Sequence, residues 1–276
     1  MGAELLRTQG LTKHFGGVTA VDDVSLSLSS EETVALIGPN GAGKTTFFNL
    51  LTGSLAPSAG TVEFRRDGEW LDITDLGTHE TAQAGIHRSY QVTNIFPTST
   101  VRENVRVAAQ AHGSDTHRFW RHADGFDAYH EEASSILERV GLAALADRPA
   151  QALSHGEKRN LELAIALAGD PDLLLLDEPA AGVSSESVDD VVDLIRDVAR
   201  DHAVLLVEHN MDVVMDLADR ITVLHRGARI ADGEPEAVRA NERVREAYLG
   251  GYGSDEPAAS GDDGEGDAGT TGGGVA

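Results

Sequence analysis

Apolar and polar positions follow one another along the chain in an order that predicts strands followed by helices. Val24, Leu26 and Leu28 are separated by serines, which is the two-residue period of a strand with one buried face. Short apolar runs bounded by turn-forming residues are typical of strands buried on both faces, and they cover residues 33–37, 172–176 and 203–207. Helical patterns follow over residues 43–52, 186–200 and 212–217. This order predicts an α/β fold with a parallel sheet.

Two regions depart from that order. Residues 102–167 are almost entirely helical in pattern, most clearly over 129–140, and we expect a helical lobe inserted between sheet strands over about residues 92–167. The last 26 residues, 251–276, contain nine glycines and six acidic residues without lysine or arginine. Such a composition cannot offset the entropy lost on ordering. We therefore expect a folded domain over residues 1–250 and a disordered acidic, glycine-rich tail.

Charge and cysteine content exclude several classes of protein. The 46 acidic residues outnumber the 22 lysines and arginines, and the formal net charge of −24 disfavours general nucleic-acid binding. The absence of cysteine excludes a disulfide scaffold and cysteine-based zinc or redox sites. The apolar runs are too short to cross a bilayer, and residues 1–9 lack the pattern of a signal peptide. We expect an intracellular protein whose membrane role, if any, depends on a partner.

The sign of the charge points to a salty environment. Charged residues make up an ordinary 25%, but only Lys13, Lys44 and Lys158 are lysines. Carboxylates hold water and counter-ions well, so an acidic surface stays soluble in concentrated salt. The bias predicts a halophilic archaeal source, with an acidic protein from an ordinary cytoplasm as the alternative.

Residues 38–46 read GPNGAGKTT and fit the pattern G-x-x-x-x-G-K-[ST], with a predicted strand before them and a predicted helix after them. The glycines let backbone N–H groups face one point, where the helix N-terminus adds its positive dipole. Lys44 is expected to reach the β- and γ-phosphates of a nucleotide, and Thr45 to offer its hydroxyl to Mg²⁺. A glycine-rich turn with an exposed lysine is the alternative. The candidate phosphate loop consists of Gly38, Pro39, Asn40, Gly41, Ala42, Gly43, Lys44, Thr45 and Thr46.

Two acidic residues end a run of four leucines. Asp177 follows the apolar residues 173–176, where a sheet strand would meet the phosphate loop, and we expect it to hold Mg²⁺ directly or through water. Glu178 can polarise an attacking water molecule. Without the phosphate loop, the two acids would fit helix-entry charges equally well.

Three motifs in a fixed order carry a family resemblance. The phosphate loop is followed by residues 153–157, which read LSHGE, and then by residues 173–178. The middle segment alone would be an N-cap serine with a capping-box glutamate. Together, over residues 4–250, the chain resembles the ATP-binding subunits of ABC transporters. The resemblance implies ATP hydrolysis and a P-loop NTPase fold with a RecA-like core, an antiparallel β sub-lobe and an inserted α-helical sub-lobe.

The resemblance also implies roles for single residues. Glu178 would be the catalytic glutamate, and His209 the switch histidine that contacts the γ-phosphate together with Lys44. Gln91 would contact both the nucleotide and Mg²⁺ and would sense the membrane partner. Phe15 would stack on adenine. By residue type alone, Phe15 could be a core residue and His209 could cap a helix.

A second subunit would complete each site, because the family clamps two ATP molecules between two head-to-tail subunits. Ser154 and Gly156 of one subunit would face the phosphates held by the other. His155 and Glu157 replace the usual glycine and glutamine of this signature. Residues 181–184 would be the D-loop, and Ser184 stands where many relatives carry aspartate. A homodimer and a heterodimer both fit.

The resemblance extends to transport. Membrane permease subunits would dock after Gln91, where Ile95 and Phe96 suit a short coupling helix. A solute-binding protein would act indirectly, and the chain would lie on the cytoplasmic face of the membrane. Likeness to branched-chain amino-acid importer ATPases rests on residues 11–17, 20–24, 47–53, 177–182 and 245–250.

Other functions of the same family and of other classes also fit these motifs. Related subunits serve urea or amide import or lipopolysaccharide export. A soluble ABC ATPase of translation or DNA repair is the rival class, although such proteins usually fuse two cassettes or carry long coiled coils, and this chain has one cassette and no heptads. A nucleotide-binding module without turnover is a third option, and Glu178 and His209 argue against it.

Histidines gather in the helical region close to aspartates. A metal site would need them to converge on one point, but their spacing fits no helical face. We interpret the segment as a surface insertion. The residues concerned are His112, His117, His122, His130, Asp115, Asp124 and Asp127.

Overall fold

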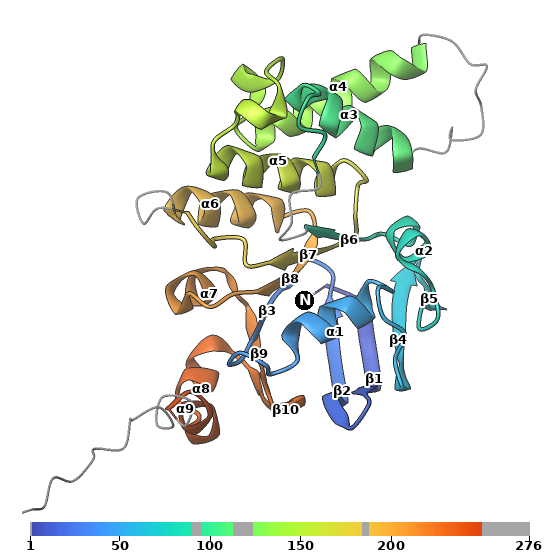
Figure 1. The fold of residues 1–276 in the computed structure, drawn as a ribbon. Coiled ribbons are helices and arrows are strands. Elements are labelled where there is room, and N and C mark those ends of the chain that lie inside the picture. The colour runs from blue at the N-terminus through green and yellow to red at the C-terminus, as the bar shows by residue number, and fades with distance from the viewer. Residues whose placement is uncertain (1, 90–94, 113–123, 184–187, 250–276) are drawn as a thin grey trace, which may run out of the picture.

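The computed structural model describes residues 2–89, 95–112, 124–183 and 188–249 (Figure 1). Among these residues, no helix combines the length and apolar character needed to cross a membrane.

Two sheets form the framework of the molecule (Figure 1). The first is antiparallel, in the order β2-β1-β4-β5. The second has the order β10-β9-β3-β8-β7-β6 and is parallel except for β10. The strands of the first sheet are β1 (Glu4–Phe15), β2 (Val18–Ser29), β4 (Ala59–Arg66) and β5 (Glu69–Asp72). Those of the second are β3 (Thr33–Ile37), β6 (Ile86–Ser89), β7 (Leu173–Asp177), β8 (Ala203–Val207), β9 (Arg220–His225) and β10 (Ala228–Gly233).

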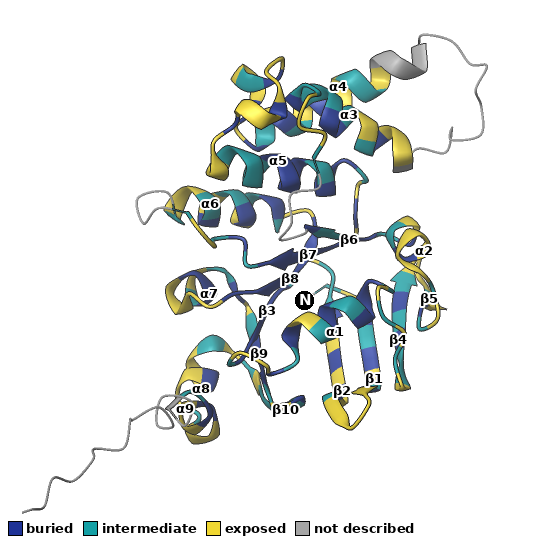
Figure 2. Ribbon diagram, in the orientation of Figure 1, coloured by how far each residue is buried: buried dark blue, intermediate teal, exposed yellow. Residues whose placement is uncertain are grey.

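The central strands confirm the apolar pattern. β3 and β8 have the expected bounds, β7 is displaced by one residue, and every residue of the three is buried. Successive side chains of a strand point to opposite faces. Accordingly Leu174 and Leu176 belong to the core cluster that includes the helical lobe, and Leu173 and Leu175 to the cluster that includes the antiparallel sheet. Figure 2 shows β3, β7 and β8 as buried strands at the centre of the molecule.

Helices cover the six-stranded sheet and form the predicted lobe. In the lobe, α3 (Val101–His112) and α4 (Asp124–Arg139) pack on α5 (His155–Leu167), and two short 3₁₀ turns, Ala143–Leu145 and Ala150–Ala152, connect the last two helices. The lobe lies at the end of the molecule away from the antiparallel sheet (Figure 1). The other helices are α1 (Lys44–Leu51), α2 (Thr78–Gln83), α6 (Val188–Val198), α7 (Met211–Leu217), α8 (Pro235–Arg239) and α9 (Glu242–Leu249).

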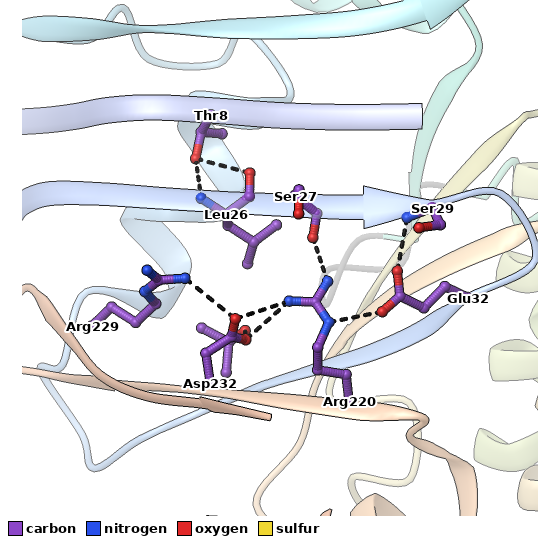
Figure 3. A network of polar contacts seen from close by, with 9 residues as sticks. Thr8, Leu26, Ser27, Ser29, Glu32, Arg220, Arg229 and Asp232 are labelled. Atoms are coloured by element: carbon purple, nitrogen blue, oxygen red, sulfur yellow. Dashed lines mark hydrogen bonds and ion pairs between the residues drawn. The ribbon is translucent and has the colours of Figure 1, made fainter. Parts of the chain in front are cut away.

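Arg220, the first residue of β9, links the two sheets (Figure 3). Its Nε donates to Glu32 Oε1 at 2.7 Å, and its Nη1 donates to Asp232 Oδ1 at 3.0 Å. Its Nη2 donates to the carbonyl oxygen of Ser27 in β2. One partly buried guanidinium therefore contacts both sheets beside the start of β3, at the opposite end of that strand from the phosphate loop.

Candidate functional site

Residues 38–43 connect the end of β3 to α1, and residues 44–46 begin that helix, as the motif predicts. Gly38 and Gly43 have φ angles of 152° and 103°, which side chains of L-residues rarely allow. A Cβ atom on Gly38 would collide with the carbonyl oxygen of Leu224. One on Gly43 would collide with the carbonyl oxygen of Ala20. The loop backbone thus packs directly on neighbouring strands, at the N-terminus of a helix whose free N–H groups favour anions.

Lys44 is buried within this loop, with 7% of its surface exposed. Its ammonium donates to the carbonyl oxygens of Gly38 at 2.5 Å and Pro39 at 3.2 Å. Burial lowers the pKa of Lys44, and the negative charges of Glu178 and Asp177 oppose that shift. Because a buried ammonium is stabilised by a nearby anion, the loop fits a phosphate chain.

Glu178 and His209 meet beyond the ends of the neighbouring parallel strands β7 and β8. His209 Nε2 lies 2.8 Å from Glu178 Oε1. The backbone N–H of Glu178 donates to the carbonyl oxygen of Val207 at 2.8 Å. Glu178 has a φ of 50°, a strained value for a residue with a side chain. The surrounding strands therefore hold this glutamate in a conformation it would not adopt alone.

Asp177, the last residue of β7, is buried beside Arg88 of β6. Arg88 Nη2 lies 2.6 Å from Asp177 Oδ2, and the two side chains are only 7% and 8% exposed. Arg88 Nη1 donates to Asn49 Oδ1 at 2.6 Å. The Asp177 carboxylate and the Thr45 hydroxyl are oxygen ligands of the type that Mg²⁺ prefers. These donors fit a magnesium ion that also binds phosphate oxygens.

A cavity of 560 Å³ joins the phosphate loop to Glu178 and His209, whereas Asp177 and Arg88 do not line it. It is lined by residues 40–46, by Glu178 and His209, by Arg226 and by Phe15. The Phe15 side chain is 48% exposed, so Phe15 is not a core residue. The volume suits a ligand of nucleotide size. The structure thus unites a phosphate-binding loop, a carboxylate and an imidazole at one end of the parallel sheet.

Comparison with known families assigns this arrangement. A sequence model described as ABC transporter matches residues 21–181, more than half of the chain. The chain belongs to the ABC transporter family. A second model, described as branched-chain amino acid ATP-binding cassette transporter, matches residues 228–253.

Known proteins resemble this ABC ATPase over nearly its whole length. The high-affinity branched-chain amino acid transport ATP-binding protein BraF of Pseudomonas aeruginosa is 40% identical, covering 91% of this chain and 99% of its own. The lipopolysaccharide export system ATP-binding protein LptB of Haemophilus influenzae is 38% identical, covering 89% and 97%. A crystal structure of an ATP-binding cassette of an ABC transporter in its ADP conformation is 32% identical, with a TM-score of 0.77 and coverage of 90% and 99%. The P-loop NTPase fold expected from the sequence is confirmed.

The signature segment of this ABC ATPase lies apart from the cavity of the same chain. Ser154 caps α5, and Glu157 completes the capping box: its Oε2 accepts from the Ser154 N–H at 2.7 Å. That hydrogen bond lowers the pKa of Glu157. His155, which replaces the usual glycine, lies against the D-loop, since a Cβ built on Gly182 would sit 3.1 Å from its Nε2. Ser154 and Gly156 are exposed and do not line the described cavity.

Some predictions concern residues outside the described part of the chain. These are the roles of Gln91 and Ser184, the disorder of the tail after residue 250, and most of the histidine cluster. Within the described residues, no group of three or more histidine, aspartate or glutamate side chains gathers as a metal site.

Sequence reasoning missed four residues around the site. Arg88 pairs with Asp177, and Arg226 lines the cavity. Arg159 donates to the carbonyl oxygens of Asp177 and Glu178, the latter at 2.9 Å. The fourth, Glu208, is buried and precedes His209 in the chain. None belongs to a pattern of spaced residues, so only their positions beside motif residues could have marked them.

Proposed function

We propose that this ABC ATPase powers the uptake of branched-chain amino acids, or of a similar small polar solute, through separate membrane subunits. The observation that carries the catalytic part is the cavity that joins residues 40–46 with Glu178 and His209. The match of residues 228–253 to a model of branched-chain amino acid transporters supports the solute class.

Hydrolysis requires that negative charge around the γ-phosphate be neutralised and that water lose a proton. The backbone N–H groups of residues 40–46 and the Lys44 ammonium would bind the phosphates. The Glu178 carboxylate would accept the proton of the attacking water, and His209, bonded to that carboxylate, would orient it and contact the γ-phosphate. Mg²⁺ held by Thr45 and Asp177 would supply further positive charge, and Gln91 would join it.

Phe15 provides a flat apolar surface for adenine at the rim of the cavity. The Lys13 ammonium lies 5.3 Å from the centroid of its ring. An exposed aromatic ring beside a phosphate loop suits stacking on a base, because stacking would bury the apolar face of the Phe15 ring.

ATP-binding subunits of ABC transporters dimerise and work with membrane permease subunits. We infer that Ser154 and Gly156, which are exposed and lie away from the cavity of their own chain, complete the site of a second copy or of a homologous subunit. The N-terminus of α5 would then direct its dipole at the phosphates of the partner's nucleotide.

The segment that precedes α3 suits contact with the permease. Phe96 is 57% exposed. The side chain of Asn104 holds the backbone of Phe96 through two hydrogen bonds. Asn104 Oδ1 accepts from the Phe96 N–H at 2.7 Å, and Asn104 Nδ2 donates to the Phe96 carbonyl oxygen at 3.1 Å. A rigidly held exposed aromatic residue suits a short helix of a membrane subunit, which would place this chain at the cytoplasmic face of the membrane.

Purified protein tests the proposal directly. In molar KCl with magnesium, we expect the chain to bind MgATP and to release phosphate. Absence of nucleotide affinity would overturn the whole proposal. Co-purification with a multi-span permease would support transport, whereas turnover without any membrane partner would favour a soluble ABC ATPase. Reconstitution with the permease distinguishes amino-acid uptake from urea or amide import and from lipopolysaccharide export.

We also propose a halophilic archaeal source, which the net charge of −24 supports. Dense carboxylates repel one another when counter-ions are scarce. Raising the KCl concentration from 0.1 M to 1 M shortens the Debye screening length from about 10 Å to about 3 Å. The free energy of unfolding measured in urea should therefore rise steeply as KCl is raised from about 0.1 M to several molar. Stability that does not depend on KCl would remove this part of the proposal.

A further inference from the structure

A buried carboxylate that the proposed mechanism does not use lies directly after β8. Glu208 is 4% exposed. Burial of an ionised carboxylate is costly unless strong donors surround it. Among the described residues, no salt bridge involves Glu208, and the donors to its carboxylate are backbone N–H groups.

The two oxygens of Glu208 bind two different loops. Oε1 accepts from the N–H of Ala180 at 2.8 Å. Oε2 accepts from the N–H of His209 at 2.9 Å and from that of Asn210 at 3.3 Å. One carboxylate therefore joins the loop that follows Glu178 to the loop that carries the switch histidine.

Through these hydrogen bonds, Glu208 connects the backbone segments that carry the two proposed reacting groups, Glu178 and His209. The side chains of Glu178 and His209 are 2.8 Å apart, and the Glu178 N–H donates to the Val207 carbonyl oxygen. Ala180 comes two residues after Glu178, whose φ of 50° is strained. Because strained conformations persist only where the surroundings impose them, the bond from Glu208 to Ala180 helps to maintain this one.

Only a carboxylate can make all three bonds. A glutamine in the same place has one acceptor oxygen, and its NH₂ group would face either the Ala180 N–H or the pair from His209 and Asn210. Two donors would then meet, and the loop on that side would move away.

We propose that Glu208 is a positioning residue: it sets the alignment of Glu178 with His209, and it couples the loop of His209 and Asn210 to the loop that carries Ala180. This inference rests on the proposed ATPase function. It predicts that the two loops shift together, because each is bonded to the same carboxylate. Glu208 acts through its neighbours and not on the nucleotide, since it does not line the described cavity.

The test is a comparison of Glu208→Gln with Glu32→Gln. Glu32 Oε2 also accepts a backbone N–H, from Ser29 at 2.7 Å, and Glu32 also sits on a structural link, but it lies at Arg220, away from the cavity. For Glu208→Gln we expect kcat to fall by about 10- to 100-fold, because a displacement of the reacting groups by about 1 Å can cause such a loss. The affinity for MgADP should stay within about twofold of wild type, because the phosphate loop is unchanged. For Glu32→Gln we expect lower thermal stability with normal kcat.

A double-mutant cycle separates positioning from folding. The single-turnover rate constant of ATP hydrolysis is measured with and without Glu208→Gln, in wild type and in His209→Ala. If Glu208 acts through His209, Glu208→Gln should lower this rate constant much less in His209→Ala than in wild type. Normal kcat in a folded Glu208→Gln variant, or full additivity with His209→Ala, would overturn the inference. If Glu208→Gln does not fold, Glu208→Asp takes its place with the same criteria, because its carboxylate is one methylene group shorter and cannot reach the N–H groups of both loops. A wild-type protein without ATPase activity would refute the proposed function instead.

Discussion

The two ends of the nucleotide cavity are built in different ways. The phosphate end is local: residues 38–46 form it, and the Lys44 ammonium bonds to carbonyl groups of the same loop. The hydrolytic end is assembled from separate elements, with Glu178 after β7 and His209 after β8. The difference teaches that the phosphate loop needs one short segment, whereas the Glu178–His209 pair depends on strand order to bring together two residues that lie 31 positions apart in the chain. Substitutions at the two ends should therefore affect different measurements.

The largest separation is expected for Glu178→Gln. Loss of the general base should lower kcat by about 10²–10⁴-fold. The affinity for MgATP should change little, because the phosphate loop is intact, and a nucleotide-bound dimer should accumulate. Phosphate release and equilibrium binding measure the two effects. Exposed Glu131→Gln in α4 serves as the control with normal values. Continued turnover by Glu178→Gln would remove Glu178 from its proposed role.

Arg88→Met tests how far the hydrolytic end depends on a buried ion pair. Removing one partner leaves Asp177 buried beside an apolar side chain, which should cost about 3–5 kcal/mol of unfolding free energy. Urea unfolding at fixed KCl measures the loss. The control Arg139→Met breaks the more exposed pairs with Asp197 and Asp201 and should cost about 1 kcal/mol or less. Equal losses would show that burial of the Arg88 pair is unimportant.

Lys44→Met should break the phosphate end alone. A hydrogen bond to a charged group contributes about 1.5–3 kcal/mol, so the affinity for MgATP should fall by about 10- to 150-fold. Stability should not fall, because burial of the ammonium is unfavourable, as its lowered pKa indicates. Calorimetric titration measures the affinity. A variant that binds normally would contradict the assignment of the loop.

Arg226→Gln should have the smallest effect. Arg226 is exposed at the cavity, and its position is held because the N–H of Gly227 donates to the carbonyl oxygen of Ala42 at 3.0 Å. Loss of an exposed charge should lower the affinity for MgADP by up to about fivefold in dilute salt, and by less in molar KCl because the charge is screened. The control Arg229→Gln removes the same charge from the same hairpin, outside the cavity lining. An equal loss for both variants would reduce the effect to net charge.

Much of the fold was predictable because its patterns are local. The three central strands follow from apolar runs, and the glycines, Lys44 and Thr45 of the phosphate loop follow from one motif. The family resemblance marked His209 as a site residue, but its contact with Glu178 was not predicted. Arg88 was missed because nothing in the sequence indicates that β6 pairs with β7 and brings its arginine to Asp177.

The sequence by itself determined the class of the protein and the end of the sheet where phosphate would bind, since a phosphate loop needs only the torsions and side chains of one contiguous segment. Only the tertiary structure decided which groups surround Glu178. His209 reaches it because β7 and β8 are parallel neighbours, and Arg159 of α5 donates to its carbonyl oxygen. Glu208 binds the N–H of Ala180, two residues further along the chain. Such proximity depends on strand order and helix packing, which no short segment encodes.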